Sequence, residues 1–525
     1  MTASARYGRE RIRAGLVHFL FGKGLSAIAG FALLVLLVRY LSVAEFAVYS
    51  VLQAFVEVFT ALTGFGLTHV ALRYIPELYA QHENRVFRRF VVGAFGLRFF
   101  LLTLATLLAW LASDDIANLF GLAAWVGVLQ AYLLVVWLRV NSHFLFQMLE
   151  STLHQGWVQV AFVLPALVKV AAVGWLVYSS ALTIQSVIWI EAAAETLGLV
   201  VLLSGVGRVL RNTPVDQTMQ SWSIWWAKNA RRLTQFGLAG YLQHLAILPY
   251  GSAPNRLVAG RYLDVASMAT FGFAQSFADT LRRYLPAQLL AGLIRPVLVA
   301  RFSVSRDFEK VTGMLSWVFR INTILLGSVA ALLLAIGPAV VASVSGGKYG
   351  AEAAWLLLAL VGVLILESHR FLIDLAIQAV ERNGLLVTGN LVLAVSLVLA
   401  VLLMPLLGAL AIPLAAGLGL ILSNTWITHR LAKEGFSYPF GYVEFGRVLL
   451  SSSFAALVGY ALQGYLHWMV NSLVVLISYV VLLVVTGAIR REDWYRLQQL
   501  KKPDAVAQNG VSLLPGHARS DSTNA

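Results

Sequence analysis

Two pairs of polar side chains lie within apolar sequence, and each pair joins a glutamine to a carboxylate four residues later. Gln53 precedes Glu57, and Gln275 precedes Asp279. This spacing places both members of a pair on one helix face, where they can exchange hydrogen bonds with a polar solute or a neighbouring helix. A carboxylate in hydrocarbon is costly unless it meets water or a partner. We therefore expect Glu57 and Asp279 to face a shared polar cavity; hydrogen bonding that only joins helices is the alternative.

Basic side chains also fall inside apolar runs: Lys23, Arg98, Lys169, Arg320 and Arg370. Lys169 lies in mid-run, too far from either end to reach water easily, so we expect it to line a cavity. Lys23, between two glycines, could face a cavity or anchor its helix at the interface. Arg98 and Arg320 lie about two turns inside their runs and could face a cavity or extend to the headgroups. Such cations could hold a phosphate group. His244 is a further cavity candidate.

Two acidic groups could take part in ion coupling. Glu191 and Glu195 lie one helical turn apart, and mutual repulsion would favour a proton on one of them. Glu367, Arg370 and Asp374 follow at helical spacing, and could form either an ion site or an internal ladder of salt bridges. No metal-ligand spacing and no cofactor motif appears in the sequence.

The composition indicates a membrane protein. The 525 residues are 59% hydrophobic and 12% charged, with a mean hydropathy of +0.77, whereas soluble domains carry about 25% charged residues. The net charge of +14 does not indicate a nucleic-acid partner, because the basic residues are spread between apolar runs. The absence of cysteine excludes disulfides and thiolate chemistry.

The apolar runs predict an all-α polytopic membrane protein with about fourteen transmembrane helices. We place them near 16–40, 44–66, 91–112, 119–138, 157–178, 183–206, 237–256, 262–284, 314–337, 351–377, 385–405, 408–428, 447–464 and 468–489. With the N-terminus inside, thirty of the 39 Lys and Arg are cytoplasmic and four lie outside: Arg39, Arg256, Arg261 and Lys348. This bias predicts that both termini are cytoplasmic.

An internal repeat divides the chain. RYLSVAEFAVYSVLQAFVE (39–57) returns as RYLDVASMATFGFAQSFAD (261–279), with eight of nineteen positions identical at an offset of 222 residues. Six predicted helices separate the copies, so both cross in the same direction and predict two pseudo-symmetric six-helix lobes. The predicted organisation is a cytoplasmic N-terminus (1–15), an N-lobe (16–206), an amphipathic cytoplasmic linker (207–236), a C-lobe (237–428), two further helices (447–489) and a largely disordered tail (490–525).

The early RYL, the segment ending AEFAVYS, and GFGLTHVALRYIPEL (64–78) before a charged loop resemble polysaccharide and O-antigen flippases. These belong to the multidrug/oligosaccharidyl-lipid/polysaccharide exporter superfamily, and the resemblance covers about residues 10–490. It implies a V-shaped pair of lobes that moves undecaprenyl-diphosphate-linked oligosaccharides across the bacterial inner membrane by alternating access. It also implies polymerase and glycosyltransferase partners in exopolysaccharide or O-antigen synthesis. The family's second lobe often has an acidic residue where this chain has Asn255, so a shared ion site is not assumed.

Alternatives remain at this stage. A drug/cation antiporter would favour an acidic pocket, whereas the buried charges here are mainly basic. A lipid II flippase is equally compatible with the fold. A membrane glycan polymerase is a different class, and it usually needs a large external loop, which the short outer loops do not offer. We therefore expect a transporter and not an enzyme.

Overall fold

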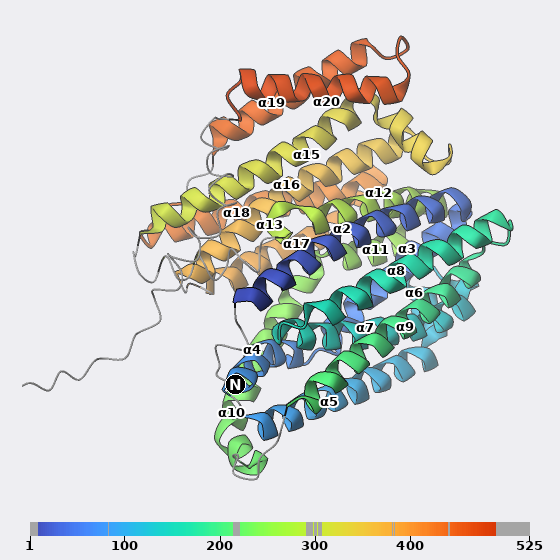
Figure 1. Ribbon diagram of the computed structural model, residues 1–525. Helices are drawn as coiled ribbons and strands as arrows, with labels where there is room; N and C mark the ends of the chain where they lie inside the picture. The colour runs from blue at the N-terminus through green and yellow to red at the C-terminus, as the bar shows by residue number, and fades with distance from the viewer. Residues whose placement is uncertain are drawn as a thin grey trace, which may run out of the picture. The chain divides into compact units, whose positions relative to one another are not determined.

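The computed structural model describes residues 9–81, 83–213, 221–289, 298, 302, 307–380, 382, 384–438 and 441–489. Within these residues the secondary structure is helical (Figure 1). The helices of 18 or more residues are fourteen: α2 (Arg9–Tyr40), α3 (Val43–Leu62), α5 (Asn84–Leu111), α7 (Val126–Ser151), α8 (Gln155–Tyr178), α9 (Ile184–Arg211), α10 (Trp222–Ile247), α12 (Val265–Tyr284), α15 (Phe308–Ser345), α16 (Ala351–Ala379), α17 (Gly384–Leu407), α18 (Ala411–Lys433), α19 (Tyr442–Ala461) and α20 (Trp468–Val485). They correspond in order to the fourteen predicted helices.

Shorter helices connect them. These are α4 (Leu67–Ala80), α6 (Ser113–Leu119), α11 (Ser252–Tyr262), α13 (Pro286–Leu289) and the 3-10 turns η1 (Ala123–Trp125), η2 (Leu248–Tyr250) and η3 (Gly408–Leu410). Ten stretches of the described chain are long and apolar enough to cross a membrane, and one of them, Gly384–Lys433, contains both α17 and α18. The helix α12 is not among the ten and carries Asp279, Arg282 and Arg283 within 20 residues.

The two copies of the repeat begin with the same kind of cap built from different residues. The Ser42 hydroxyl accepts from the amide of Glu45 at 3.2 Å, and the Glu45 carboxylate accepts from the amide of Ser42 at 3.0 Å. At the equivalent positions of α12, Asp264 accepts from the amide of Ser267 at 3.0 Å and from its hydroxyl at 2.7 Å. Each cap satisfies amides that the first helical turn leaves without partners.

Glu45 also makes a contact that its counterpart Ser267 is not seen to make. Its second carboxylate oxygen accepts from the amide of Ile184 at 2.9 Å, at the start of α9. This oxygen lies beside a helix N-terminus, where the backbone favours negative charge. The first copy is therefore attached to α9 through its own cap.

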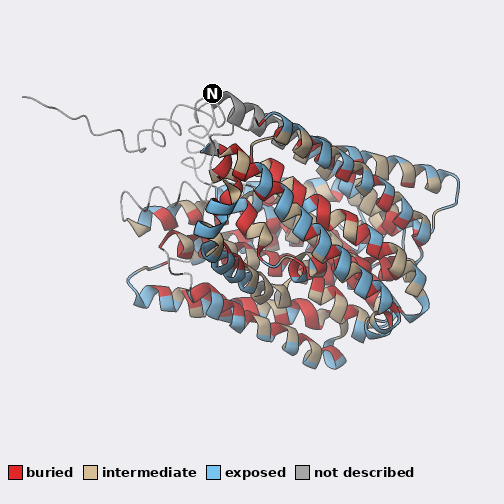
Figure 2. Ribbon diagram, turned by 90° about the horizontal axis from the view of Figure 1, so that it is seen from below, coloured by how far each residue is buried: buried red, intermediate tan, exposed pale blue. Residues whose placement is uncertain are grey.

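The described chain forms two compact units. Unit 1 comprises residues 1–284, 338–363 and 387–423, and unit 2 comprises 285–337, 364–386 and 424–525. In unit 1, α7 packs on α9, α2 on α8, and α3 on both α11 and α12. Unit 2 has a core of apolar side chains from α15, α16 and α18, including Leu315, Leu372 and Ile427. Buried and exposed residues alternate along single helices (Figure 2), as expected where one face packs on protein.

One boundary between the units falls at a break in α15. Ile336 has non-helical dihedral angles (φ −139°, ψ 18°), and Pro338 follows two residues later. Proline removes a backbone donor and disturbs the preceding turn, which accounts for the kink. The boundary between Gly337 and Pro338 lies at this point. The predicted lobe boundaries are a different division of the chain, and they stay a prediction.

Two predicted boundaries differ from the structure. The helix predicted to end at 138 continues as α7 to Ser151, so that Arg139 lies inside it and not in a cytoplasmic connection. Within the predicted amphipathic linker (207–236), the segment Trp222–Arg232 forms the first part of α10. A separate helix, α11, then carries Arg256, which the sequence had placed outside. The tail after residue 489 lies outside the described residues.

Candidate functional site

Arg256 of α11 joins the polar side chains of both repeat copies. Its Nη1 donates to Gln53 Oε1 of α3 at 3.1 Å, and its Nη2 donates to Asp279 Oδ2 of α12 at 2.8 Å. Gln275 Nε2 donates to the other oxygen of Asp279 at 2.9 Å. Arg256 is only 4% exposed. A buried guanidinium with several acceptors is the partner that a buried carboxylate requires.

Glu57 contacts the first turn of the same short helix. Its Oε2 accepts from the Ala253 amide at 3.1 Å and from the Ser252 hydroxyl at 3.3 Å, both in the first turn of α11. The positive end of a helix stabilises such a carboxylate. The side chains predicted to line a cavity, Gln53, Glu57, Gln275 and Asp279, therefore all contribute to a network that joins α3, α11 and α12, which we call the α11 network.

A second polar contact joins the ends of α2 and α15, which the charge pattern predicts to lie on the outer side. Arg39 donates from Nη2 to the Ser343 carbonyl at 2.5 Å and from Nε to the Val344 carbonyl at 3.1 Å. Lys348 donates to the Leu41 carbonyl at 2.5 Å. Each cation thus lies at the carbonyl end of the other helix, where the backbone favours positive charge. Burial lowers the pKa of Lys348.

Arg98 is fully enclosed and does not extend to the headgroups, which was one of its two predicted placements. It is 1% exposed, and its Nη1 donates to the Thr63 carbonyl at the end of α3 at 2.7 Å. Within the described residues it forms no ion pair, and its Nε has no hydrogen-bond partner. A buried guanidinium without a carboxylate is a candidate to bind an anion.

The turn beside Arg98 is closely packed. Gly66, at a φ of +71°, touches the Gly237 carbonyl of α10 so closely that a Cβ atom would overlap it. Nearby on α10, the ring of His244 lies 6.2 Å from that of His69. His244 is half-buried and is thus placed among the same elements as Arg98.

Lys169, Glu191 and Glu195 come together around Arg139. Arg139 pairs with Glu191 at 3.1 Å and with Glu195 at 3.0 Å, and Lys169 pairs with Glu195 at 2.6 Å. The Tyr49 hydroxyl donates to Glu191 at 2.6 Å. Two cations thus face two carboxylates, so the charge balances without the extra proton predicted for this pair. We call these four charged residues the Arg139 cluster.

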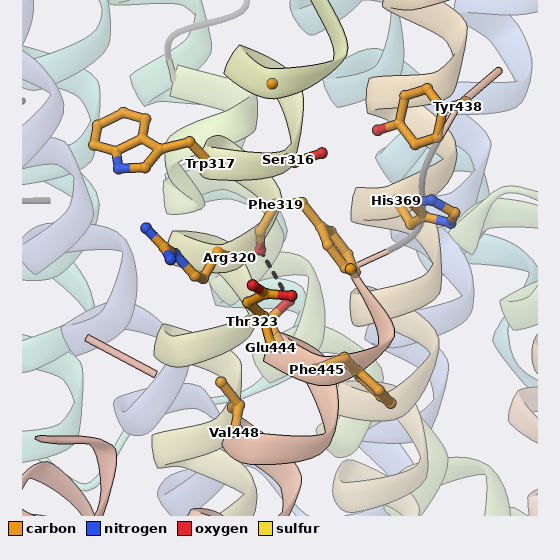
Figure 3. Close-up of a pocket in the computed structure, with 12 residues that line it drawn as sticks. Ser316, Trp317, Phe319, Arg320, Thr323, His369, Tyr438, Glu444, Phe445 and Val448 are labelled. Atoms are coloured by element: carbon orange, nitrogen blue, oxygen red, sulfur yellow. Dashed lines mark hydrogen bonds between the residues drawn. The ribbon is translucent and has the colours of Figure 1, made fainter. Parts of the chain in front are cut away.

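The remaining candidates have separate surroundings. Lys23 lies 5.8 Å from the ring centre of Phe162 on α8. In unit 2, Arg370 pairs with Asp374 at 2.8 Å, as the salt-bridged alternative expected, and Glu367 lies one turn earlier on α16. Arg320 lines a cavity of unit 2 (Figure 3). No group of three potential metal ligands occurs in the part of the chain that the structure describes.

Sequence reasoning missed Arg139 and Arg256, which organise both clusters. Arg139 was assigned to the connection after the helix predicted to end at 138, and Arg256 to the outer end of the helix predicted over 237–256. A useful signal was present: every buried carboxylate needs a cation at comparable depth. Searching for partners of Asp279 and Glu191 would have favoured these arginines. The contacts of the α11 network and of the Arg139 cluster hold helices together. That any of these side chains binds a solute stays a prediction.

Comparisons with known proteins give a family and a fold. The family described as polysaccharide biosynthesis protein matches residues 12–287. No curated protein sequence matches the chain. A lipid II flippase MurJ structure in an inward closed conformation has a TM-score of 0.64 at 12% identity, covering 89% of this chain and 98% of that one. An inward-facing MATE multidrug transporter of the MOP superfamily has a TM-score of 0.62 at 13% identity, covering 78% and 95%. These likenesses show the fold.

Proposed function

Because this chain belongs to the polysaccharide biosynthesis protein family, we propose that it is a flippase for lipid-linked oligosaccharides. Its substrate is a sugar repeat unit joined by diphosphate to undecaprenol, and it moves across the bacterial inner membrane by alternating access, for exopolysaccharide or O-antigen synthesis. The protein acts as a transporter and not as an enzyme. Its partners are the polymerase and glycosyltransferases of the same pathway, and both of its termini are cytoplasmic.

The α11 network is the observation that carries this proposal. The helices α3 and α12 are the two copies of one repeat, and Arg256 joins them through Gln53 and Asp279. Alternating access requires a contact between repeated elements that closes one side and can separate. An ion pair with hydrogen bonds can exchange its partners for water, so this junction can open. Arg39 and Lys348 add contacts between the end of α2 and the end of α15, on the side that the charge pattern predicts to be outer.

The substrate requires a polar route because neither sugars nor a diphosphate cross hydrocarbon cheaply. Arg98 is the strongest candidate to bind the diphosphate, since it has no carboxylate partner among the described residues. Lys169 is a weaker candidate because Glu195 already holds it. Gln53 and Gln275 can bond sugar hydroxyls only when Arg256 and Asp279 release them. The polyprenyl tail stays in the lipid.

Reconstituted protein tests the proposal directly. Vesicles containing the full chain and a lipid-linked oligosaccharide of the host should expose the glycan of the inner leaflet to an external glycosidase. Protein-free vesicles should leave about half of the glycan protected. In the cell, a deletion strain should accumulate the lipid-linked oligosaccharide on the cytoplasmic side. Unchanged protection in vesicles would contradict the proposal.

A second candidate, lipid II transport, is favoured by the fold shared with a lipid II flippase over 89% of this chain. The same vesicles prepared with lipid II distinguish the two substrates. Loss of a dispensable glycan on deletion supports the oligosaccharide, and arrested growth supports lipid II. Increased drug sensitivity without loss of glycan would instead support drug/cation antiport; the similar MATE family protein is named a multidrug resistance transporter.

A further inference from the structure

Unit 2 contains a cavity that the proposed transport path does not use. It has a volume of about 260 Å³ and lies between the first halves of α15 and α19, with His369 of α16 and Tyr438 at one side (Figure 3). A single water needs only about 10–15 Å³ of such space. The cavity can therefore hold a group much larger than one water.

The wall of the cavity combines both signs of charge with aromatic rings. Arg320 comes from α15 and Glu444 from the first turn of α19. Trp317, one turn before Arg320, lies on the same side of the view, and Tyr438 lies on the other (Figure 3). A guanidinium suits a phosphate, whereas a carboxylate and aromatic faces suit an ammonium.

Two buried polar atoms of this wall have no hydrogen-bond partner among the described residues: Trp317 Nε1 and Tyr438 Oη. Tyr438 is 8% exposed. Buried donors without partners are costly and uncommon in native proteins. A ligand with acceptor oxygens would satisfy both, which independently indicates that the cavity is built to be occupied.

The cavity lies toward the cytoplasmic ends of its helices, as the charge pattern assigns them. Glu444 is in the first turn of α19, and Arg320 is twelve residues after the start of α15. Gly441, at the start of α19, also lines the cavity, and the Glu444 carboxylate lies against it. Lipid headgroups of the inner leaflet are the polar groups at this level.

We propose that this cavity binds the headgroup of a zwitterionic phospholipid that carries a phosphate and a primary ammonium. Arg320 and Trp317 Nε1 hold the phosphate, while Glu444 and the neighbouring rings hold the ammonium. A purely anionic headgroup would meet the repulsion of Glu444, and a neutral sugar would use neither charge. This site is independent of the proposed transport function.

Native mass spectrometry of the full-length protein in detergent tests the site with three probes: phosphatidylethanolamine, phosphatidylglycerol and a maltoside. We expect phosphatidylethanolamine to bind about tenfold more tightly than phosphatidylglycerol, the effect of one charged contact. Glu444→Gln should remove this preference, and Arg320→Gln should weaken both lipids. Equal binding of the two lipids by the unchanged protein would overturn the proposal. Preferential binding of the maltoside would assign the cavity to sugars instead.

A second set of variants separates this site from lipid bound elsewhere. Gly313 lines the cavity and has open space where a side chain would project, so Gly313→Leu fills the cavity without removing a polar group. It should abolish the selective binding, and retained selectivity would overturn the proposal. The matched controls are Gly446→Leu, also with open space on α19, and Glu434→Gln, a carboxylate that pairs with Arg382. Both should keep the preference.

Discussion

Asp279 accepts a hydrogen bond from Arg256 on one carboxylate oxygen and from Gln275 on the other, so both of its oxygens have a donor. The two residues are 23 positions apart in sequence; Asp279 belongs to the second repeat copy, whereas Arg256 lies on α11 and also bonds Gln53 of the first copy. One guanidinium thus bonds a side chain of each repeated helix, and these two helices also pack directly on each other. The predictions below follow from this and the other buried cations.

Removing the Arg256 guanidinium should open the α11 network. Because Arg256→Gln leaves the partly buried Asp279 with Arg282, 4.0 Å away, as its remaining cation, we expect a loss of up to about 3–5 kcal/mol in the free energy of unfolding. We also expect increased external access to α12. The protein has no cysteine, so Thr280→Cys on α12 gives a single reporter for a membrane-impermeant maleimide. Arg261→Gln is the control, because Arg261 is an exposed arginine of α11, the helix that carries Arg256. Unchanged labelling would show that Arg256 does not hold this side closed.

Arg139→Met should be the most destabilising single change in the Arg139 cluster. It leaves Glu191 with only Tyr49 and Glu195 with only Lys169, and a buried charge without its partner costs about 3–5 kcal/mol. Thermal unfolding in detergent measures the loss. The triple variant with Glu191→Gln and Glu195→Gln should recover much of it. Arg208→Gln, at an exposed arginine of α9, should have little effect.

Arg98→Gln should reduce transport of a diphosphate-linked substrate more than it reduces stability. The change removes a positive charge but keeps an amide that can still donate to the Thr63 carbonyl. We expect at least about a tenfold slower rate in the vesicle assay, which corresponds to ~1.4 kcal/mol of lost interaction. Thr103→Ala, on the same helix, is the control, since its hydroxyl bonds Trp137 away from Arg98. Full activity of Arg98→Gln would remove this residue from substrate binding.

The stability of the folded protein should depend on pH through Lys348. Burial lowers its pKa below the ordinary value of 10.5, so the folded protein binds this proton less tightly than the unfolded chain does. Stability from this group therefore rises as pH increases from the folded pKa toward 10.5. We expect the melting temperature of the unchanged protein, relative to Lys348→Gln, to increase as the pH rises toward 10.5. A decrease over that interval would contradict the assignment.

The helices could be predicted from the sequence because apolar length is a local property. Even so, the helix that corresponds to α7 was predicted to end just before Arg139. Local hydropathy contains no information that Glu191 and Glu195 of α9 pair with this arginine. The same limit placed Arg256 at the outer end of the helix predicted over 237–256. Its burial depends on Asp279 and Gln53, which are 23 and 203 residues away in sequence. The repeat puts the Gln53–Glu57 and Gln275–Asp279 pairs at equivalent positions, and Arg256 bonds a member of each pair; that they line a cavity stays a prediction.

The exchanged caps make the duplicated segments unequal. In the first copy, Glu45 caps α3 and also reaches the backbone of α9; in the second, Asp264 and Ser267 close the cap between themselves. Replacing residues 261–279 by the sequence of 39–57 would make the two segments identical and would put a glutamate at the position of Ser267. The reverse replacement would put a serine at position 45 and remove the hydrogen bond that Glu45 accepts from the Ile184 amide at the start of α9. The duplicated segments therefore differ in how their first turns are held: the first is bonded to the start of α9, and the second is capped within its own turn.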